Sequence, residues 1–468
     1  MIFVSRKGVS LVSEKSVKTP EEALKKQFVK NNAIDPKFYD KFGVKRGLRN
    51  PDGTGVMAGV TNICNVHGYV VNEGEKEPVD GKLFFRGYSI NDIVDNAVKE
   101  NRFGYEEVVF LLLFGSLPTK GELDAFLLLI DANKELPNAF FEDMILKAPS
   151  KNIMNKMARS ILALYSYDDN PEDISPNHEL STAVSIISKL PSIMVSAYQV
   201  QQRSFFGKTM IMHPLIKGLS TAETILSTLR PDRKYTHEEA MLLDLMLMIH
   251  AEHGGGNNST FSCRVLTSSG TDPYSAYAAA IGSLKGPKHG GANAKVLQMQ
   301  RCIEENVSNW EDEGEVADFL RKIVRKEAND NSGLIYGMGH AVYTKSDPRA
   351  VILKENAKKL AHGTEFERKF NLLETIEKLS PEILRETGKS KDVCANVDMY
   401  SGLVYQMLGI PQDLFTPLFA VSRMAGWCAH RFEELVTGRR IIRPAYKSVL
   451  KSKEYVPLNE RKFEKGEK

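Results

Sequence analysis

From Ile90 almost to the C-terminus, the sequence is divided by helix-capping signals rather than by the alternating pattern of β-strands. Thr119–Glu122 and Thr236–Glu239 are capping boxes, in which a threonine and a glutamate three residues later bond to each other's backbone N–H groups. Asp272-Pro273 places an N-cap residue before a proline at the first helical position. The helix opened by Thr236 is apolar on nearly every face from Met241 to Ile249, which predicts a buried central helix. We therefore predict an all-α fold.

One stretch departs from this helical pattern. Residues 53–87 contain repeated glycines with β-branched residues between them. Such runs bounded by turn residues are typical of short strands. We predict a minor β-hairpin near residues 56–87, around Tyr69 to Val79.

Two prolines fall inside predicted helices. Proline removes a backbone donor and crowds the preceding turn. We expect Pro191 to kink or split a long helix and Pro417 to bend another.

The charge density of the predicted helices changes along the chain, which indicates a domain boundary. Helices after residue 290 are far more charged than those before it, and the chain becomes apolar again near residue 400. We predict a large helical domain from residues 1–289 and 393–468, with a smaller inserted helical domain from residues 290–392. Ligands favour the cleft between two lobes, so we expect the site where the chain crosses between them.

Composition and charge exclude several classes of protein. The 62 basic and 59 acidic side chains leave a net charge of +3, which gives no support to general nucleic-acid binding. The run Met241 to Ile249 is too short to span a membrane, which takes about 20 residues, and Arg6 and Lys7 interrupt any secretory signal. The five cysteines are scattered and never form a CxxC pair, which favours a reducing compartment. We expect a cytoplasmic protein that binds neither nucleic acid nor membrane.

His289 lies in Gly286–Asn293 (GPKHGGAN), between a proline and two glycines. The proline fixes the backbone on one side, and the glycines allow a turn or a close approach to a ligand on the other. One interpretation is a plain turn between two helices. The other is an imidazole presented on a rigid support for chemistry.

A second histidine, His340, follows the glycines of GMGHAVY and leads to Asp347-Pro348-Arg349. This places Arg349 in a first helical turn, where a cation is unfavourable unless an anion is present. The glycines alone would merely turn the chain, and they are a weak dinucleotide signature.

Asp398 stands in NVDMYSG just ahead of an apolar helix. It is either a helix N-cap or a general base whose pKa is raised by its apolar neighbours.

The segment His250-Ala251-Glu252-His253 carries two histidines three residues apart. A metal site is a weak alternative because the HExxH spacing is absent. We favour His253 as a group facing an anion near a helix end.

Arg423 lies in an otherwise apolar helix, and Arg443 precedes Pro444. A guanidinium among apolar residues needs a carboxylate, and an internal salt bridge is the commoner source. Together, Arg349, Arg423 and Arg443 have the chemistry to hold a dicarboxylate through bidentate contacts.

Taken in order, GPKHGGAN, GMGHAVYTKSDPRA and NVDMYSG resemble the citrate synthase family (si-type). HAEHGGGNNST before them and RPAY after Ile442 match as well, so the resemblance covers about Gly81 to Tyr446. It implies condensation of acetyl-CoA with oxaloacetate, then hydrolysis to citrate and CoA. Acetyl-CoA is a substrate here, and no cofactor or metal is required.

The resemblance also implies roles for individual residues. Asp398 would remove a proton from the acetyl methyl group, and His289 would hydrogen-bond the thioester oxygen. His340 would polarise the ketone of oxaloacetate. The oxaloacetate carboxylates would be bound by His253, Arg349 and Arg423. Arg443 would reach the site from the partner subunit of a homodimer. The CoA adenine would contact the loop that contains Leu334, Ile335, Gly337 and Gly339.

Two departures and two alternatives accompany the resemblance. Ala341 replaces an arginine found in many relatives, and Lys288 is expected to depress the pKa of His289. A 2-methylcitrate synthase would use propionyl-CoA with the same residues, and one methylene is worth only about 1–3 kcal/mol in a pocket. A non-catalytic or metal-binding helical scaffold is the alternative from another class.

Overall fold

The computed structural model describes residues 20–51, 53–72, 75–388 and 393–461. Contacts divide the chain into a terminal unit, Met1–Val56 with Pro444–Lys468, and a main unit, Met57–Arg443. The described helices of the terminal unit are α1 (Pro20–Asn32), α2 (Lys37–Lys41) and the short 3₁₀ turns η1 (Arg46–Leu48) and η5 (Leu458–Glu460). The proposed division into residues 1–289 with 393–468 and residues 290–392 stays a prediction.

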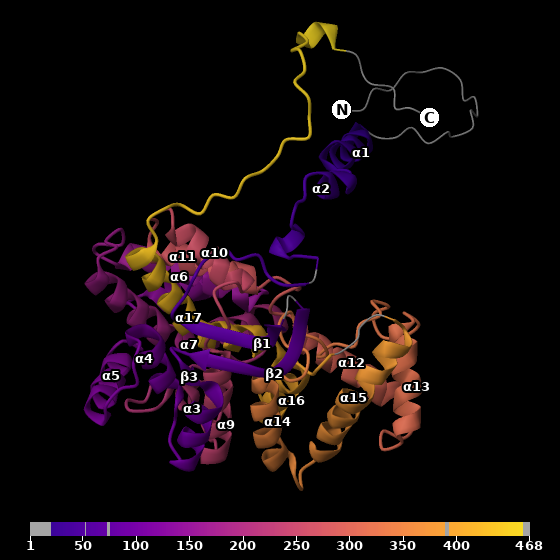
Figure 1. Cartoon of the computed structure of the whole chain (residues 1–468). Helices are drawn as coiled ribbons and strands as arrows, with labels where there is room; N and C mark the ends of the chain where they lie inside the picture. The colour runs from indigo at the N-terminus through magenta and orange to yellow at the C-terminus, as the bar shows by residue number, and fades with distance from the viewer. Residues whose placement is uncertain (1–19, 52, 73–74, 389–392, 462–468) are drawn as a thin grey trace, which may run out of the picture. The chain divides into compact units, whose positions relative to one another are not determined.

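The main unit is built almost entirely of helices, which confirms the predicted fold class (Figure 1). Its helices, in chain order, are α3 (Ile90–Lys99), α4 (Tyr105–Phe114), α5 (Lys120–Ala132), η2 (Phe141–Leu146), α6 (Ile153–Leu164), η3 (Tyr165–Tyr167), α7 (Pro176–Phe206), α8 (Thr221–Leu229), α9 (His237–His250), α10 (Asn258–Thr267), α11 (Pro273–Leu284), α12 (Ala292–Asn306), α13 (Glu313–Val324), α14 (Pro348–Ala361), α15 (Glu367–Glu386), α16 (Asp398–Met407), η4 (Gln412–Leu414) and α17 (Phe415–Thr437).

A small antiparallel sheet is the only strand structure among the described residues. Its strands are β1 (Cys64–Asn72), β2 (Glu75–Phe85) and β3 (Tyr88–Ser89), in the order β1-β2-β3. This confirms the predicted hairpin. The register between β1 and β2 shifts between His67 and Tyr69, so the pair contains a bulge. Such bulges bend a strand and redirect what it presents to its neighbours.

Local capping explains where several helices begin. The capping boxes predicted at Thr119 and Thr236 are both present, and Ser220 with Glu223 forms a third at the start of α8. The Asp272 side chain accepts a hydrogen bond from the Ser275 N–H at the start of α11. Each cap satisfies backbone donors that the first helical turn leaves without partners.

The structure places both prolines inside helices: Pro191 does not split its helix, and the kink at Pro191 and the bend at Pro417 stay predictions. Helix α7 runs unbroken through Pro191, whose neighbours in the helix are buried among the core helices. Tertiary packing therefore outweighs the missing backbone hydrogen bond. Pro417 falls in the first turn of α17, where no intrahelical donor is lost.

By length and composition α7 is also the one described helix able to cross a membrane, but 72% of its most apolar window is buried inside the molecule.

Helices α9 and α17 run through the core and position the site. Every residue of α9 from Leu242 to His250 is buried, as the sequence predicts. Helix α17 packs against α4, α7, α9, α10 and α11. Helices α14, α15 and α16 lie side by side and contact one another (Figure 1). The candidate site residues are carried by the ends of these elements and by the loops that join them.

Candidate active site

Two loops that carry predicted site residues are joined by hydrogen bonds. Asn396 is the central residue of this link: its N–H donates to the Gly337 carbonyl at 2.9 Å, and its side-chain Nδ2 donates to the Gly339 carbonyl at 2.8 Å. Gly337 and Gly339 have φ angles of 86° and 91°, which side chains rarely tolerate. The glycines of the His340 motif are therefore required by this link to the Asp398 motif.

Asp398 begins α16, and its backbone N–H donates to Asn396 Oδ1 at 3.0 Å. Burial raises the pKa of the Asp398 carboxyl to about 6, the Arg349 charge opposes this rise, and Asp347 adds to it. The carboxylate is therefore ionised at neutral pH yet more basic than an ordinary aspartate, as a general base requires.

The backbone fixes the protonation pattern of His340. Its Nδ1 accepts hydrogen bonds from the N–H groups of Val342 at 3.0 Å and Tyr343 at 3.2 Å. The neutral ring must then carry its proton on Nε2, which makes Nε2–H a hydrogen-bond donor. The His340 ring stacks on Tyr343, with centroids 4.6 Å apart, and meets the edge of His253 at 5.1 Å.

His253 is buried three residues beyond the end of α9. Its Nε2 is 3.3 Å from the Tyr343 hydroxyl. Burial and the nearby charges of Arg349 and His340 hold the pKa of His253 well below its ordinary value. The ring is therefore neutral in the physiological pH range, and it lies beside His340.

Arg423 is fully buried in α17 without a carboxylate bonded to it. Its Nε donates to the His250 carbonyl at 2.6 Å, while Nη1 and Nη2 have no hydrogen-bond partner among the described residues. Burial lowers the pKa of Arg423 to about 10, which still leaves it charged at neutral pH, and Glu252 opposes the lowering. Unpaired buried donors are costly, so these two nitrogens indicate an anionic ligand.

Arg349 differs from Arg423, because it is paired within the protein. It lies in the first turn of α14, and its guanidinium forms two hydrogen bonds with Asp347, the N-cap of the same helix. The anion expected near this helix start is thus Asp347. The nearby Asp398 carboxylate also raises the pKa of Arg349.

His289 lies in a turn between α11 and α12, where its Nε2 is 3.0 Å from Ser259 Oγ. Ser259 also accepts a hydrogen bond from Trp427 Nε1 at 3.2 Å. Burial and the Arg423 charge lower the pKa of His289 to about 4. Lys288 does not contribute, so the expectation that it would depress this pKa was wrong; its side chain is exposed. At the adjacent Gly290, an added Cβ would lie 2.4 Å from the Leu284 carbonyl oxygen, so this turn requires glycine.

Helix α17 connects these groups in space. Arg423 and Trp427 are four residues apart and so lie along one face of the helix. Trp427 reaches Ser259 and through it His289, while Arg423 influences the pKa of both His289 and His253. Helix α17 thereby links His289 to the neighbouring rings of His253 and His340.

The remaining predicted residues lie further from these contacts. Leu334 is exposed and Ile335 is buried, in the loop that leads to Gly337. Arg443 is exposed beyond α17 and makes no hydrogen bond or ion pair with the described residues. Sequence reasoning missed roles for Ser259, Tyr343 and Asp347, although all three stand inside or beside the quoted motifs.

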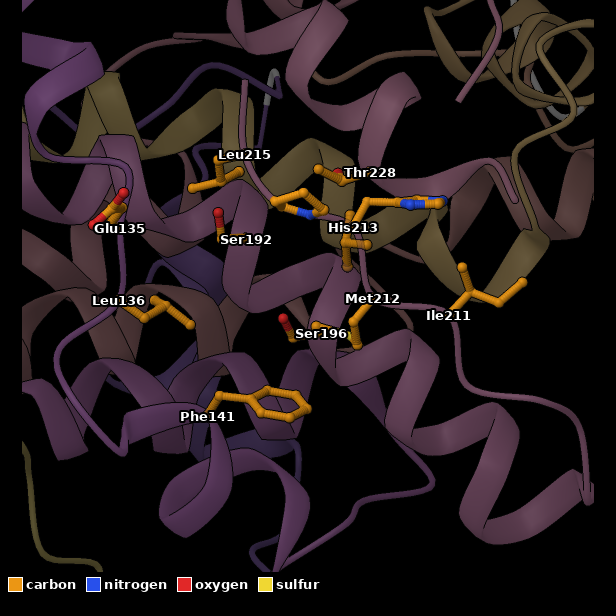
Figure 2. Close-up of a pocket in the computed structure, with 12 residues that line it drawn as sticks. Glu135, Leu136, Phe141, Ser192, Ser196, Ile211, Met212, His213, Leu215 and Thr228 are labelled. Atoms are coloured by element: carbon orange, nitrogen blue, oxygen red, sulfur yellow. The ribbon is translucent and has the colours of Figure 1, made fainter. Parts of the chain in front are cut away.

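The pocket of about 260 Å³ in Figure 2 is elsewhere in the main unit. It lies between α7 and the segment that contains Met212 and His213, and none of the predicted site residues lines it (Figure 2). Among the described residues, no group of three or more His, Cys, Asp or Glu side chains is placed to share a metal ion.

Comparisons with known proteins find similar sequences and structures over most of the chain. The family described as "Citrate synthase, C-terminal domain" matches residues 50–445. A citrate synthase of Synechocystis is 32% identical over 409 residues, which covers 87% of this chain and 92% of the relative. A 2-methylcitrate synthase 1 of Corynebacterium glutamicum is 31% identical and covers 89% and 98%.

A solved structure gives the same result for the fold. It is described as citrate synthase from Thermoplasma acidophilum in ternary complex with carboxymethyl coenzyme A and oxaloacetate. It superposes with a TM-score of 0.71 at 25% identity, over 89% of this chain and 99% of that one.

Proposed function

The chain belongs to the citrate synthase family, and we propose that Asp398, His289 and His340 carry out its reaction, the condensation of acetyl-CoA with oxaloacetate. Water then hydrolyses the condensation product to citrate and CoA. The observation that carries the proposal is the buried Arg423 guanidinium, whose Nη1 and Nη2 lack hydrogen-bond partners among the described residues, near the buried, neutral His253. A dicarboxylate would supply the missing acceptors.

Oxaloacetate would bind to the groups around Arg423. One carboxylate would accept hydrogen bonds from Arg423, and His253 and Arg349 would contact the carboxylates from either side. His340 would donate its Nε2–H to the ketone oxygen, because two backbone N–H groups already occupy Nδ1. This donor stabilises the alkoxide charge as it develops.

Proton removal from the acetyl methyl group needs a base and a donor that act together. Asp398, with its pKa near 6, is the base. His289 is neutral. The Ser259 hydroxyl lies 3.0 Å from its Nε2 and 3.0 Å from Asn257 Oδ1, and in the state in which the hydroxyl donates to Nε2 rather than to Asn257 the ring proton resides on Nδ1. Nδ1–H would then donate to the thioester oxygen, where negative charge appears only in the transition state.

The assembly of the site is part of the same proposal. Arg443 is exposed at the end of the main unit, which suits a side chain that completes the site of a partner subunit in a homodimer. The loop Leu334–Gly339 would contact the CoA adenine. We also propose a cytoplasmic location, from the five scattered cysteines, none of which forms a CxxC pair.

The experiment that tests the proposal is release of free thiol from acetyl-CoA in the presence of oxaloacetate. We expect wild-type protein to release thiol, and Asp398→Ala to abolish release while oxaloacetate binding, measured by calorimetry, stays nearly intact. Normal turnover by this variant would refute the assignment of the base.

A second candidate function is the use of propionyl-CoA, because one relative of similar identity is a 2-methylcitrate synthase. The same assay with both acyl-CoAs at equal concentration decides between them through the ratio of their kcat/KM values. Metal analysis of the purified protein tests the non-catalytic, metal-binding alternative: stoichiometric metal without thiol release would support it.

A further inference from the structure

We propose that Tyr343, supported from behind by the β1–β2 hairpin, is the positioning residue that sets both His340 and His253 for oxaloacetate. This inference rests on the proposed function of those two histidines. Tyr343 is 1% exposed and lies in the loop between His340 and the Asp347 cap of α14. It contacts both rings while the hairpin contacts its opposite side.

The hairpin approaches this loop too closely for any side chain to fit between them. A Cβ added at Gly81 would lie 2.1 Å from the Ser346 carbonyl oxygen and 2.7 Å from Tyr343 Cδ1. A Cβ added at Gly68 would lie 2.7 Å from the Val342 carbonyl oxygen and 3.1 Å from Tyr343 Cδ1. Neither glycine has a positive φ, so the backbone itself would accept alanine. Glycine is required at these two positions only because the loop that carries Tyr343 lies so close to them.

The hairpin is also bonded to the loop and shaped to meet it. The Gly81 N–H donates to Ser346 Oγ at 3.1 Å. Gly68 and Gly81 both lie at the register shift, where the pairing passes from His67 with Lys82 to Tyr69 with Pro78, so that residues 79–81 of β2 stand opposite Gly68 alone. A bulge beside a functional loop is a common device for directing a strand toward it. The irregular register therefore coincides with the point of contact.

Val342 transmits this contact to His340. Its carbonyl faces Gly68, and the N–H of the same peptide group, which belongs to Tyr343, donates to His340 Nδ1 at 3.2 Å; the N–H of Val342 donates to the same nitrogen at 3.0 Å. A displacement of this peptide by the hairpin would therefore rotate or release the imidazole and disturb the proton on its Nε2.

The two parts of the Tyr343 side chain act on different histidines. The ring stacks on His340 with an interplanar angle of 25°, which holds the imidazole plane. The hydroxyl lies 3.3 Å from His253 Nε2 and gives that buried ring nitrogen a partner. Burial raises the pKa of Tyr343 far above its ordinary value, so the hydroxyl keeps its proton at working pH. Ring and hydroxyl can thus be removed separately.

The experiment compares Tyr343→Phe with Tyr343→Leu in the thiol-release assay, with KM measured for both substrates. We expect Tyr343→Phe to raise the KM for oxaloacetate about five-fold, as for one lost hydrogen bond, with kcat little changed. We expect Tyr343→Leu to lower kcat at least about ten-fold as well, because His340 loses its support. The KM for acetyl-CoA should change little in both variants. The matched control is Tyr88→Leu, at an exposed tyrosine of β3.

The hairpin is tested with Gly81→Ala and Gly68→Ala against Gly121→Ala, whose added Cβ would meet nothing within 4 Å. A displacement of the loop by about 1 Å should lower kcat/KM on the order of 100-fold. Circular dichroism and thermal melting report the folded fraction, so that activity is expressed per folded molecule.

The outcomes are separable. If Tyr343→Leu keeps wild-type kcat, or if the two hairpin variants lose activity only in proportion to unfolded protein, the positioning role is wrong. If wild-type protein releases no thiol from either acyl-CoA, the proposed function itself fails, and the variants are not needed to show it.

Discussion

Arg349 and Asp347 form a two-point ion pair at the start of α14, with Nη2 2.7 Å from Oδ2 and Nε 3.1 Å from Oδ1. Both side chains are buried. Arg423, in contrast, has no carboxylate bonded to its guanidinium. The two arginines proposed for substrate binding are therefore in different states before substrate arrives: Arg349 is already positioned by its partner, and Arg423 awaits an acceptor.

Replacing Asp347 should disturb both neighbours of this carboxylate. In Asp347→Asn the helix cap is kept but the buried Arg349 charge is left unpaired, which typically costs about 3–5 kcal/mol. The negative charge of Asp347 raises the pKa of Asp398, so its removal should move the acidic limb of the kcat profile to lower pH. Denaturant unfolding and a pH–rate profile measure the two effects. The control is Asp312→Asn, at an exposed N-cap of α13 that holds no arginine; an equal loss in both variants would contradict the pairing argument.

Arg423→Met should separate stability from binding. Methionine keeps the apolar stem and removes two buried donors that have no partner, and this gain offsets the loss of the Nε hydrogen bond to the His250 carbonyl, so the free energy of unfolding should stay equal or rise by about 1–4 kcal/mol. Oxaloacetate binding should be lost, as measured by calorimetry.

The contrasting variant lies on the same helix. Arg431 is equally buried but paired with Glu179, with Nε 2.9 Å from Oε2. Arg431→Met leaves that carboxylate buried and unpaired and should destabilise by about 3–5 kcal/mol. If Arg423→Met were the less stable of the two, the Arg423 guanidinium would not be a buried charge that lacks a partner in the substrate-free protein.

Activity should fall as pH drops below about 6, because Asp398 must be ionised to act as a base. The folded-state pKa of Asp398 is raised above its ordinary value, so its burial favours the protonated form. Its contribution to stability is therefore fully present below about pH 4 and is lost as pH rises through 6. Asp398→Asn should consequently be more stable than wild type at pH 7.5, by on the order of 2 kcal/mol at most, and equal to it at pH 4. Thermal melts of the two proteins across this range decide the sign.

Mixing two inactive variants tests which subunit supplies Arg443 to each active site. If Arg443 serves the neighbouring site, a heterodimer of Asp398→Ala and Arg443→Ala subunits contains one intact site, and thiol release should reappear after the subunits are exchanged. If Arg443 serves its own subunit, or the protein is a monomer, the mixture stays inactive. Light scattering of the wild-type protein provides the oligomeric state for the comparison.

The sequence by itself determined the helices and the order of the chemical motifs. Caps such as Thr236 with Glu239 depend on residues three apart, so local spacing was sufficient to predict them. The hairpin followed from its glycines and β-branched residues. His289, His340 and Asp398 were found because each stands in a short motif of unusual composition.

Only the tertiary structure decided which groups face one another. Pro191 is accommodated within α7 because packing of the whole helix outweighs one lost bond. Sequence could not tell which arginine has an internal partner. The partner of Arg349 is Asp347, two residues earlier, but the groups around Arg423 come from distant helices, so its lack of a carboxylate partner is visible only in the folded chain. The same reason hid Tyr343: its contacts with His253 and with the hairpin join segments far apart in the chain, and long-range packing alone brings them within reach.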